Sequence, residues 1–128
     1  MSLTESPVAV MLPITEPGRA QQFYGERLGL AYDDGGGDDE FAYQLVGGSR
    51  LVLRVLPDAQ PSPNTAMSFQ VADLTAEIAA LESRGVAFED YDSPGFTTVD
   101  HVLESDGMRA AWFLDPDGNV LCLHQPTG

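Results

Sequence analysis

Two stretches of the chain repeat one order of hydrophobic and polar positions. In the first stretch, residues 8–14 form a short continuous apolar run, which predicts a strand. Helical spacing follows from Pro17, a residue typical of a first helical turn, to a stop at Gly29. Further strands are expected near residues 30–33, 41–46 and 50–55, with a Gly47-Gly48 turn between the last two. The pattern predicts a strand, a helix and three strands over about residues 7–56.

The second stretch has the same order. A strand is expected at residues 66–71, and Asp73 is placed to cap a helix that presents one apolar face and ends at Gly85. Further strands are expected near residues 86–89, 108–114 and 119–124. This second module covers about residues 65–126, and the proline-rich segment 57–64 reads as a stiff linker.

The residue identities also indicate an internal duplication. "YGERLGLAYDD" from Tyr24 matches "ALESRGVAFED" from Ala80, and "AVMLPITE" from Ala9 matches "AMSFQVAD" from Ala66. Residues 51–53 match residues 120–122 at an offset of 69. Three matches in one order favour tandem copies of a module of roughly 55 to 60 residues. We therefore expect one α+β domain made of two βαβββ modules.

Composition limits the class of protein. The chain has 128 residues, of which 43% are hydrophobic and 20% charged, as expected for one globular domain. Its longest apolar runs fall short of the roughly 20 residues of a membrane helix, and its start lacks the basic segment of a secretory signal. A single cysteine excludes an intramolecular disulfide and indicates a reducing cytoplasm. The expectation is a cytoplasmic protein with no membrane partner.

Charge narrows the possible partners. The formal net charge is -14, from 20 acidic and 6 basic residues. Nucleic acid is therefore not an expected partner, because phosphate binding needs clustered Lys and Arg. An acidic surface attracts a cationic ligand, although solubility or adaptation to salt is the more ordinary explanation. The acidic run "DDGGGDDE", residues 33–40, lacks calcium-loop spacing and is expected to be a solvated loop.

The motif "FYGERLGL" after the first strand and "DPDGN" in the last hairpin resemble the vicinal oxygen chelate superfamily of glyoxalases, extradiol dioxygenases and bleomycin-resistance proteins. The resemblance covers essentially the whole chain. It implies that the two modules curve into a U-shaped cleft and that the protein is a homodimer. In metal-dependent members, up to four His, Gln or Glu ligands come from equivalent strand positions.

Those four positions carry no such ligands here. By the resemblance they fall on Ala9, Leu53, Ala66 and Cys122, and alanine and leucine do not coordinate metals. A shift of one residue offers residues that are no better as ligands: Pro7 or Val8, Val52, Thr65 or Met67, and Leu121. We therefore expect neither a metal nor another cofactor.

Side chains alternate along a strand, so the turns decide which residues face the cleft. A two-residue Gly47-Gly48 turn sets Ala42 opposite Leu53 and Gln44 opposite Leu51. A four-residue turn over 115–118 sets Ala111 opposite Cys122 and Phe113 opposite Val120. The expected core residues facing the helices are then Tyr43, Val52, Trp112 and Leu121.

The predicted cleft is apolar with a few polar groups, as in sites for organic ligands. The alternative is that core side chains or a partner subunit fill it. Its predicted ligand-binding residues are Met11, Gln44, Leu53, Ser68, Gln70, Arg109, Phe113, Cys122 and His124.

Several of these residues have competing interpretations. Cys122 with His124 would make a weak nucleophile and base, but a cysteine between two leucines is more often a small buried hydrophobe. Arg109 would bind a ligand carboxylate or, more ordinarily, a neighbouring acid. His101, without a carboxylate at metal spacing, is poor support for a site. Residues 93–107 form a lid over the cleft or a disordered loop.

The leading hypothesis is a metal-independent protein that binds a small organic molecule, as bleomycin-resistance proteins do, and sequesters a cationic antibiotic or similar ligand. The alternative is a divergent glyoxalase-like lyase or dioxygenase with a non-standard site. A third possibility is an interaction module, which would use the cleft for docking. The sequence leaves open whether the chain is an enzyme and favours binding without catalysis.

Overall fold

The computed structural model describes residues 2–33 and 38–127. Residues up to Gln60 form one compact unit and residues from Pro61 form the other. This division falls inside the segment 57–64, where the linker was predicted. The acidic run at 33–40 lies partly outside the described residues, at 34–37. No helix in the described part of the chain is long and apolar enough to cross a membrane.

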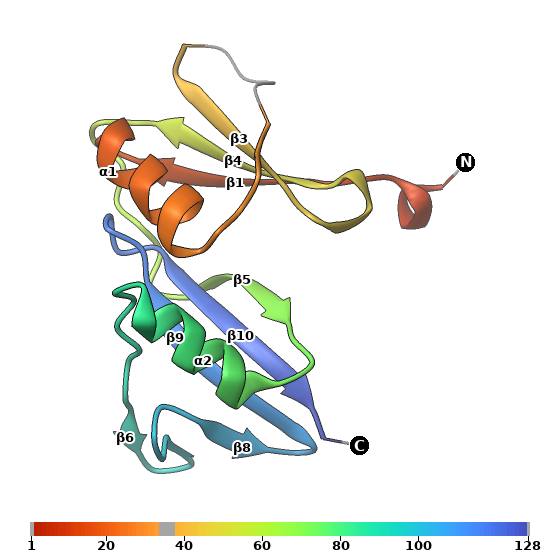
Figure 1. The fold of residues 1–128 in the computed structure, drawn as a ribbon, viewed down its shortest axis with the longest axis vertical. Helices are drawn as coiled ribbons and strands as arrows, with labels where there is room; N and C mark the ends of the chain where they lie inside the picture. Colours follow the sequence, from red (N-terminus) through yellow and green to blue (C-terminus); the bar gives the residue numbers. More distant parts are fainter. Residues whose placement is uncertain (1, 34–37, 128) are drawn as a thin grey trace. The chain divides into compact units, whose positions relative to one another are not determined.

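The first unit is a four-stranded sheet with one helix (Figure 1). The sheet order is β1-β4-β3-β2, with β1 parallel to β4 and the other pairs antiparallel. Two 3₁₀ turns, η1 (Leu3–Glu5) and η3 (Val46–Gly48), lie outside the sheet. The other elements are β1 (Ala9–Ile14), α1 (Pro17–Gln21), the π-helical turn η2 (Gln22–Arg27), β2 (Tyr32–Asp33), β3 (Glu40–Gln44) and β4 (Arg50–Val55).

Local sequence sets both ends of the first helix. Pro17 occupies the first turn, and the Glu16 carboxylate accepts hydrogen bonds from the Gly18 and Arg19 amides at 3.0 and 2.8 Å. Gly29, at φ 75°, ends the helical segment in the left-handed conformation that glycine adopts readily. The predicted start and stop are both confirmed.

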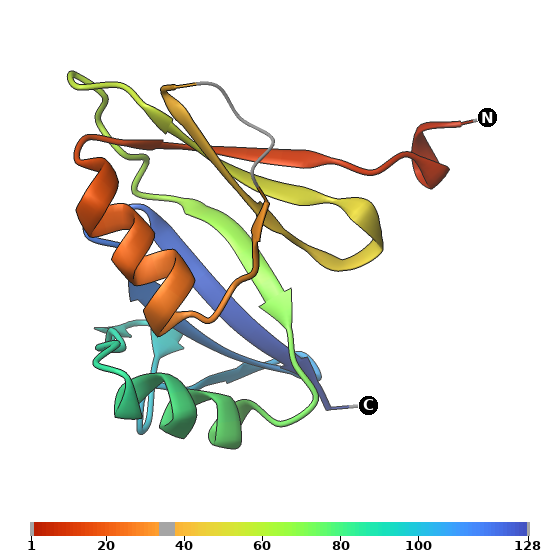
Figure 2. The same ribbon diagram turned by 45° about the horizontal axis from the view of Figure 1, so that its top comes forward.

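The second unit repeats this plan with sheet order β5-β10-β9-β8, and α2 lies along β9 and β10 (Figures 1 and 2). The prediction of a strand at residues 86–89 was wrong. Those described residues have only an isolated bridge between Phe88 and Phe113, and β8 supplies the fourth strand. The elements are β5 (Thr65–Gln70), α2 (Leu74–Ser83), β6 (Asp92–Ser93), β7 (Phe96–Thr97), β8 (Leu103–Ser105), β9 (Met108–Leu114) and β10 (Val120–Pro126).

The helix α2 begins and packs as the sequence predicts. The Asp73 carboxylate accepts from the Ala76 amide at 3.1 Å, which satisfies a donor that the first turn leaves free. Its apolar face, Leu74, Ile78 and Leu81, is buried. Together with the helix-facing side of the sheet, this face forms the core of the second unit. The α+β class with two helix-and-sheet modules is confirmed.

The predicted register of the first hairpin was wrong by one residue. Leu45 pairs with Ser49 across a three-residue loop, so Leu53 lies opposite Phe41 and Leu51 opposite Tyr43. The two-residue turn assumed from the glycines was one residue too short. Because partners across a ladder share a face, Leu53 lies with Tyr43 on the helix side, and Val52 lies on the other face.

The predicted register of the second hairpin was also wrong by one residue, because the four-residue turn assumed over 115–118 was one residue too long. Asp115 pairs with Asn119 across three residues, so Trp112 lies opposite Cys122 and Phe113 opposite Leu121. The Asp115 side chain fixes this loop by accepting from the amides of Asp117 and Asn119 at 2.9 and 2.8 Å. The prediction that Trp112 faces the helix was therefore wrong, whereas Leu121 does face it.

The two hairpins match when their loops are aligned. Gly48 and Gly118, at φ 79° and 93°, occupy the last loop position in each. This places Val52 at the position of Cys122 and Ala42 at that of Trp112, an offset of 70 rather than 69. Throughout, "open face" means the sheet surface opposite the unit's own helix.

Candidate functional site

The open face of the second sheet carries a small polar cluster. Ser68, Cys122 and His124 lie on β5 and β10 and share this face through the parallel register. The Ser68 Oγ and His124 Nδ1 atoms are 2.5 Å apart and hydrogen-bonded. Ser68 is exposed, so this pair is accessible from the open face.

An aromatic trio, defined here as Tyr91, Phe96 and Trp112, lies beside the polar cluster. The ring centroids are 5.3 Å apart for Tyr91 and Phe96, 5.8 Å for Tyr91 and Trp112, and 5.2 Å for Phe96 and Trp112. These separations are within the range of favourable aromatic pairs. Trp112 is the cross-strand partner of Cys122, and its indole N–H donates to Thr65 Oγ1 at 3.0 Å. The trio thus extends the open face with apolar ring surface.

A small hairpin positions the two rings that do not come from the sheet. Ser93 pairs with Phe96 around Pro94-Gly95, and Gly95 has φ 77°, as the third residue of a type II turn requires. Below the turn, the Tyr91 amide donates to Thr98 Oγ1 at 2.9 Å. The segment 93–107, predicted as a lid or a disordered loop, thus contains ordered hairpin structure.

The thiol of Cys122 is buried, with 5% of the residue exposed. Burial raises the pKa of this thiol, and a hydrogen bond with Ser68 only partly opposes that effect. The Sγ atom donates to the Leu123 carbonyl at 3.3 Å. A buried thiol with a raised pKa stays protonated at neutral pH and is a poor nucleophile. The structure therefore favours the small-hydrophobe interpretation of Cys122.

Tyr91 is also held in its neutral form. Burial raises the pKa of its phenol, and the charge of Glu89 raises it further. A neutral phenol both donates and accepts hydrogen bonds. The open face therefore presents aromatic surface, the hydroxyls of Ser68 and Tyr91, and the imidazole of His124.

The nine predicted site residues divide between the two sides of their sheets. The corrected register puts three of them on the helix side: Leu53, Arg109 and Phe113. Their expected position in a cleft with the others was wrong, because each hairpin loop has three residues. The other six lie on open faces, where a ligand-binding role stays a prediction: Met11, Gln44, Ser68, Gln70, Cys122 and His124.

The residues at the superfamily's metal positions do not fit a metal. With the corrected register, these positions on the open faces are Ala9, Val52, Ala66 and Cys122. Three of them have no donor atom, and the fourth is a buried protonated thiol. Within residues 2–33 and 38–127, no group of three or more His, Cys, Asp or Glu side chains is arranged to hold an ion.

The open face of the first sheet is simpler. It presents Met11 and Val52 as parallel-strand partners, and Ala42 lies opposite Val52. The exposed Arg54 forms a 3.5 Å ion pair with Glu40 at the far end of the strands. This face has aliphatic side chains at the positions where the second sheet has Ser68, Cys122 and Trp112.

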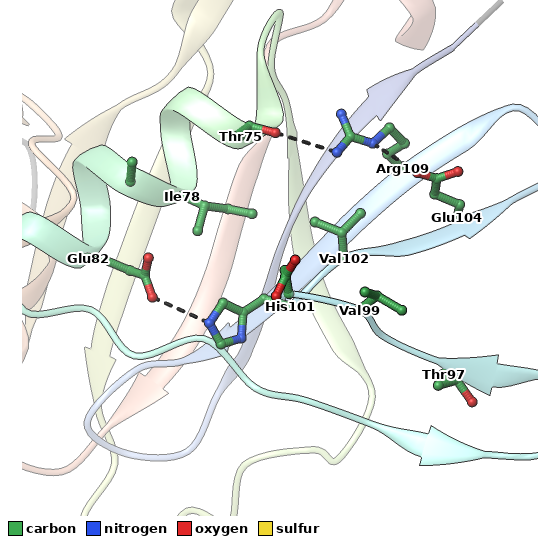
Figure 3. Close-up of a pocket in the computed structure, with 11 residues that line it drawn as sticks. Thr75, Ile78, Glu82, Thr97, Val99, His101, Val102, Glu104 and Arg109 are labelled. Carbon is green, nitrogen blue, oxygen red and sulfur yellow. Dashed lines mark hydrogen bonds and ion pairs between the residues drawn. The ribbon is translucent and has the colours of Figure 1, made fainter.

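A pocket of about 790 Å³ lies on the other side of the second sheet, between α2 and residues 97–104 (Figure 3). His101 lines it, with Nδ1 2.9 Å from Asp90 Oδ2 and Nε2 3.4 Å from Glu82 Oε2. Arg109 also lines it, 3.6 Å from Glu104. Its pairing with a neighbouring acid agrees with the more ordinary interpretation of Arg109.

Sequence reasoning missed the aromatic trio and this second pocket. A signal for the trio was present, since Tyr91 and Phe96 flank the turn-forming pair Pro94-Gly95. The pocket gave no comparable signal. The pocket forms only where α2, the 97–104 segment and β9 pack together, and this packing brings Glu82, His101 and Arg109 to its wall.

The comparisons with known proteins agree with this architecture. The family model described as a glyoxalase-like domain matches residues 9–124. The chain belongs to the glyoxalase-like domain family. This membership is consistent with the vicinal oxygen chelate superfamily that the two motifs resembled. Among curated proteins, the comparison finds no match.

Two similar solved structures come from Streptomyces sp. CB03234. The antibiotic-binding protein TnmS3 is 28% identical, with a TM-score of 0.72 over 94% of this chain and 95% of that one. A glyoxalase/bleomycin resistance protein is 29% identical, with a TM-score of 0.68 over 94% of this chain and 100% of that one. A glyoxalase/bleomycin resistance protein/dioxygenase from Alicyclobacillus acidocaldarius shares the fold. It is 15% identical, with a TM-score of 0.73 over 100% of this chain and 96% of that one.

Proposed function

We propose that this glyoxalase-like protein binds a small organic molecule, without a metal, on the open face of its second sheet. The observation that carries the proposal is the aromatic trio beside the Ser68–His124 pair. Such a face combines apolar ring surface with a few orienting polar groups, as organic-ligand sites do. The similarity to an antibiotic-binding protein at 28% identity supports an antibiotic as the ligand.

We propose sequestration rather than catalysis as its action. Metal chemistry has no support in the residues at the superfamily's ligand positions. Covalent catalysis by Cys122 also lacks support, because its thiol is buried and the pKa of that thiol is raised. The net charge of -14 favours a ligand that carries an amine. A cationic antibiotic with planar rings would suit both the charge and the trio.

Titration with daunorubicin and bleomycin tests this function, because each carries amines and aromatic rings. Trp112 is the only tryptophan, so quenching of its fluorescence reports directly on the trio. We expect saturation near one drug per chain, followed by recovery of unmodified drug on mass spectrometry. Drug that returns modified over many turnovers would show an enzyme. Failure of both drugs to quench Trp112 would contradict binding of cationic aromatic antibiotics.

Metal content tests the metal-free part separately. Plasma mass spectrometry on protein purified without chelator or nickel resin is expected to find well under about one equivalent of any transition metal. About one equivalent, together with loss of drug binding after chelation, would overturn this part.

We also propose that the protein acts in the cytoplasm as a homodimer. The single buried cysteine suits a reducing compartment. Exposed apolar side chains in the first unit offer material for a subunit interface: Leu3, Val8, Met11, Tyr32 and Val46. Light scattering on the full chain tests the assembly, with a mass of about 27 kDa expected from the 13.7 kDa chain. A mass near 14 kDa over the micromolar range would contradict it.

A further inference from the structure

The helix-side pocket has charged groups of opposite sign at its two ends (Figure 3). Its volume of about 790 Å³ lies in the range of small-molecule sites. It lies on the opposite side of the second sheet from the aromatic trio, because its residue Arg109 shares a face with Leu121 and Phe113. It is therefore separate from the site proposed above.

At one end of the pocket lies the Arg109 guanidinium, which makes few good hydrogen bonds within the protein. The Arg109 Nε atom is buried and has no hydrogen-bond acceptor, and its nearest carboxylate, Glu104, is 3.6 Å away. The Nη2 atom reaches Thr75 Oγ1 only at 3.5 Å, the limit for a hydrogen bond. Glu104 is exposed, and such a pair contributes little. A ligand carboxylate would give this guanidinium the two-pronged partner that its geometry favours.

The other end is acidic. Glu82 projects from the last turns of α2, and Asp100 precedes His101 in the loop opposite. The His101 ring lies between the carboxylates of Glu82 and Asp90. Because His101 is held between them, Glu82 is kept at the pocket wall. The side chain of Glu82 is 45% exposed, so it can accept hydrogen bonds from an incoming ammonium group.

The length between these ends follows from the helix. Thr75, beside Arg109, and Glu82 are seven residues apart on α2, which corresponds to about 10 Å along the axis. Ile78 and Val102 line the wall between them (Figure 3). The pocket therefore has an apolar middle with a positive and a negative end.

We propose that this pocket binds an extended zwitterion, such as a short peptide or a long amino alkanoate, with its carboxylate at Arg109 and its ammonium at Glu82 and Asp100. A dipolar ligand satisfies both ends at once. The apolar middle packs against the stem of such a ligand. A ligand with one charge interacts with the charged group at only one end of the pocket.

The test is a set of three probes of one length: 8-aminooctanoate, octylamine and octanoate. Titration of ¹⁵N-labelled protein is expected to shift the amide signals of residues 75–82 and 97–104. Because partly exposed ion pairs contribute modestly, we expect the zwitterion to bind about threefold to fivefold more tightly than either single-charge analogue. Equal affinity for octylamine and the zwitterion would overturn the assignment of Arg109.

Two variants test the orientation of the ligand. Arg109→Gln is expected to weaken the zwitterion and octanoate about threefold to fivefold and to leave octylamine unchanged, whereas Glu82→Gln weakens the zwitterion and octylamine only. Glu77→Gln is the matched control, since Glu77 lies on the same helix and does not line the pocket. Arg109→Lys keeps the charge and is expected to retain the preference for the zwitterion if Arg109→Gln fails to fold. Equal weakening of all three probes by one variant would overturn the proposal.

Discussion

The open faces of the two sheets differ far more than the sheets themselves. Both sheets have four strands, with a parallel pair at one edge and a three-residue hairpin loop between their last two strands. At equivalent positions, however, the first face has Met11, Val52 and Ala42 where the second has Ser68, Cys122 and Trp112. The buried helix-facing residues, such as Leu53 and Leu121, are apolar in both. The two sheets therefore differ mainly in the chemistry of their open faces and not in their cores.

The difference extends to the connection that follows each helix. Gly29 precedes β3 by 11 positions, whereas Gly85 precedes β9 by 23. The longer segment supplies Tyr91 and Phe96 to the aromatic trio on one side of the sheet. It also supplies residues 97–104 to the helix-side pocket. Both proposed binding sites therefore depend on the part of the second module that the first module lacks.

Replacing Trp112 by the residue of the first sheet is the strongest test of this comparison. Trp112→Ala removes the ring that both other members of the trio contact, so we expect daunorubicin affinity to fall by about tenfold or more. Calorimetry measures the loss without needing tryptophan fluorescence. Arg54→Gln, at an exposed position on the first open face, is the control and is expected to change affinity by less than about twofold. A large loss in the control would contradict the assignment to the second face.

Substitutions in the two hairpin loops are expected to lower the free energy of unfolding by different amounts. Asp115→Ala removes three hydrogen bonds and leaves the buried Asn119 amide, 2.7 Å from the carboxylate, without this acceptor, so we expect a loss of about 3 kcal/mol in the free energy of unfolding. Gly48→Ala strains a left-handed position in the first loop and is expected to cost about 1 kcal/mol. Urea denaturation measures both. Equal losses would show that backbone conformation, rather than the Asp115 side chain, fixes the second loop.

The ends of the two helices were predictable because single residues at each end determine where a helix starts and stops. Pro17 and Asp73 mark helix starts, and Gly29 and Gly85 mark helix stops, and the structure has all four in these roles. The helix signals are local, so one sequence was enough to interpret them. Met11 and Ser68 were placed on open faces by counting along each strand from Ala9 and Ala66, the positions that the superfamily resemblance supplied.

Register was not predictable in the same way. Loops of two, three and four residues share the same Gly, Asp and Pro signals, and a difference of one residue exchanges the two faces. This single ambiguity misplaced Leu53, Arg109, Phe113 and Trp112 together. The helix-side pocket depends on long-range packing between α2 and residues 97–104, which no periodicity encodes.

The buried thiol gives a smaller difference between the sheets, visible in the pH dependence of stability. The raised pKa of Cys122 means that the folded state holds its proton more tightly, so the thiol's contribution to stability is constant below its ordinary pKa of 9.0 and falls as pH rises above it. Cys122→Val copies Val52 of the first sheet and is expected to make this fall shallower. Part of the fall in stability is expected to remain in this variant, because the pKa values of Tyr43 and Tyr91 are also raised. Urea titrations from pH 7 to 10.5 measure the slope, and an unchanged slope would contradict this role of the thiol.

The smallest expected effect concerns Ser68, whose equivalent in the first sheet is Met11. Its hydroxyl bonds His124 Nδ1 and so orients the imidazole for a ligand. Ser68→Ala removes that bond, and we expect daunorubicin affinity to fall about threefold, because one hydrogen bond contributes about 1 kcal/mol or less. The free energy of unfolding is expected to change by less than about 0.5 kcal/mol, since Ser68 is exposed. His124→Gln should cause a similar loss, and the double variant should lose little more, because both changes break one interaction. Additive losses would mean that Ser68 and His124 act on the ligand independently.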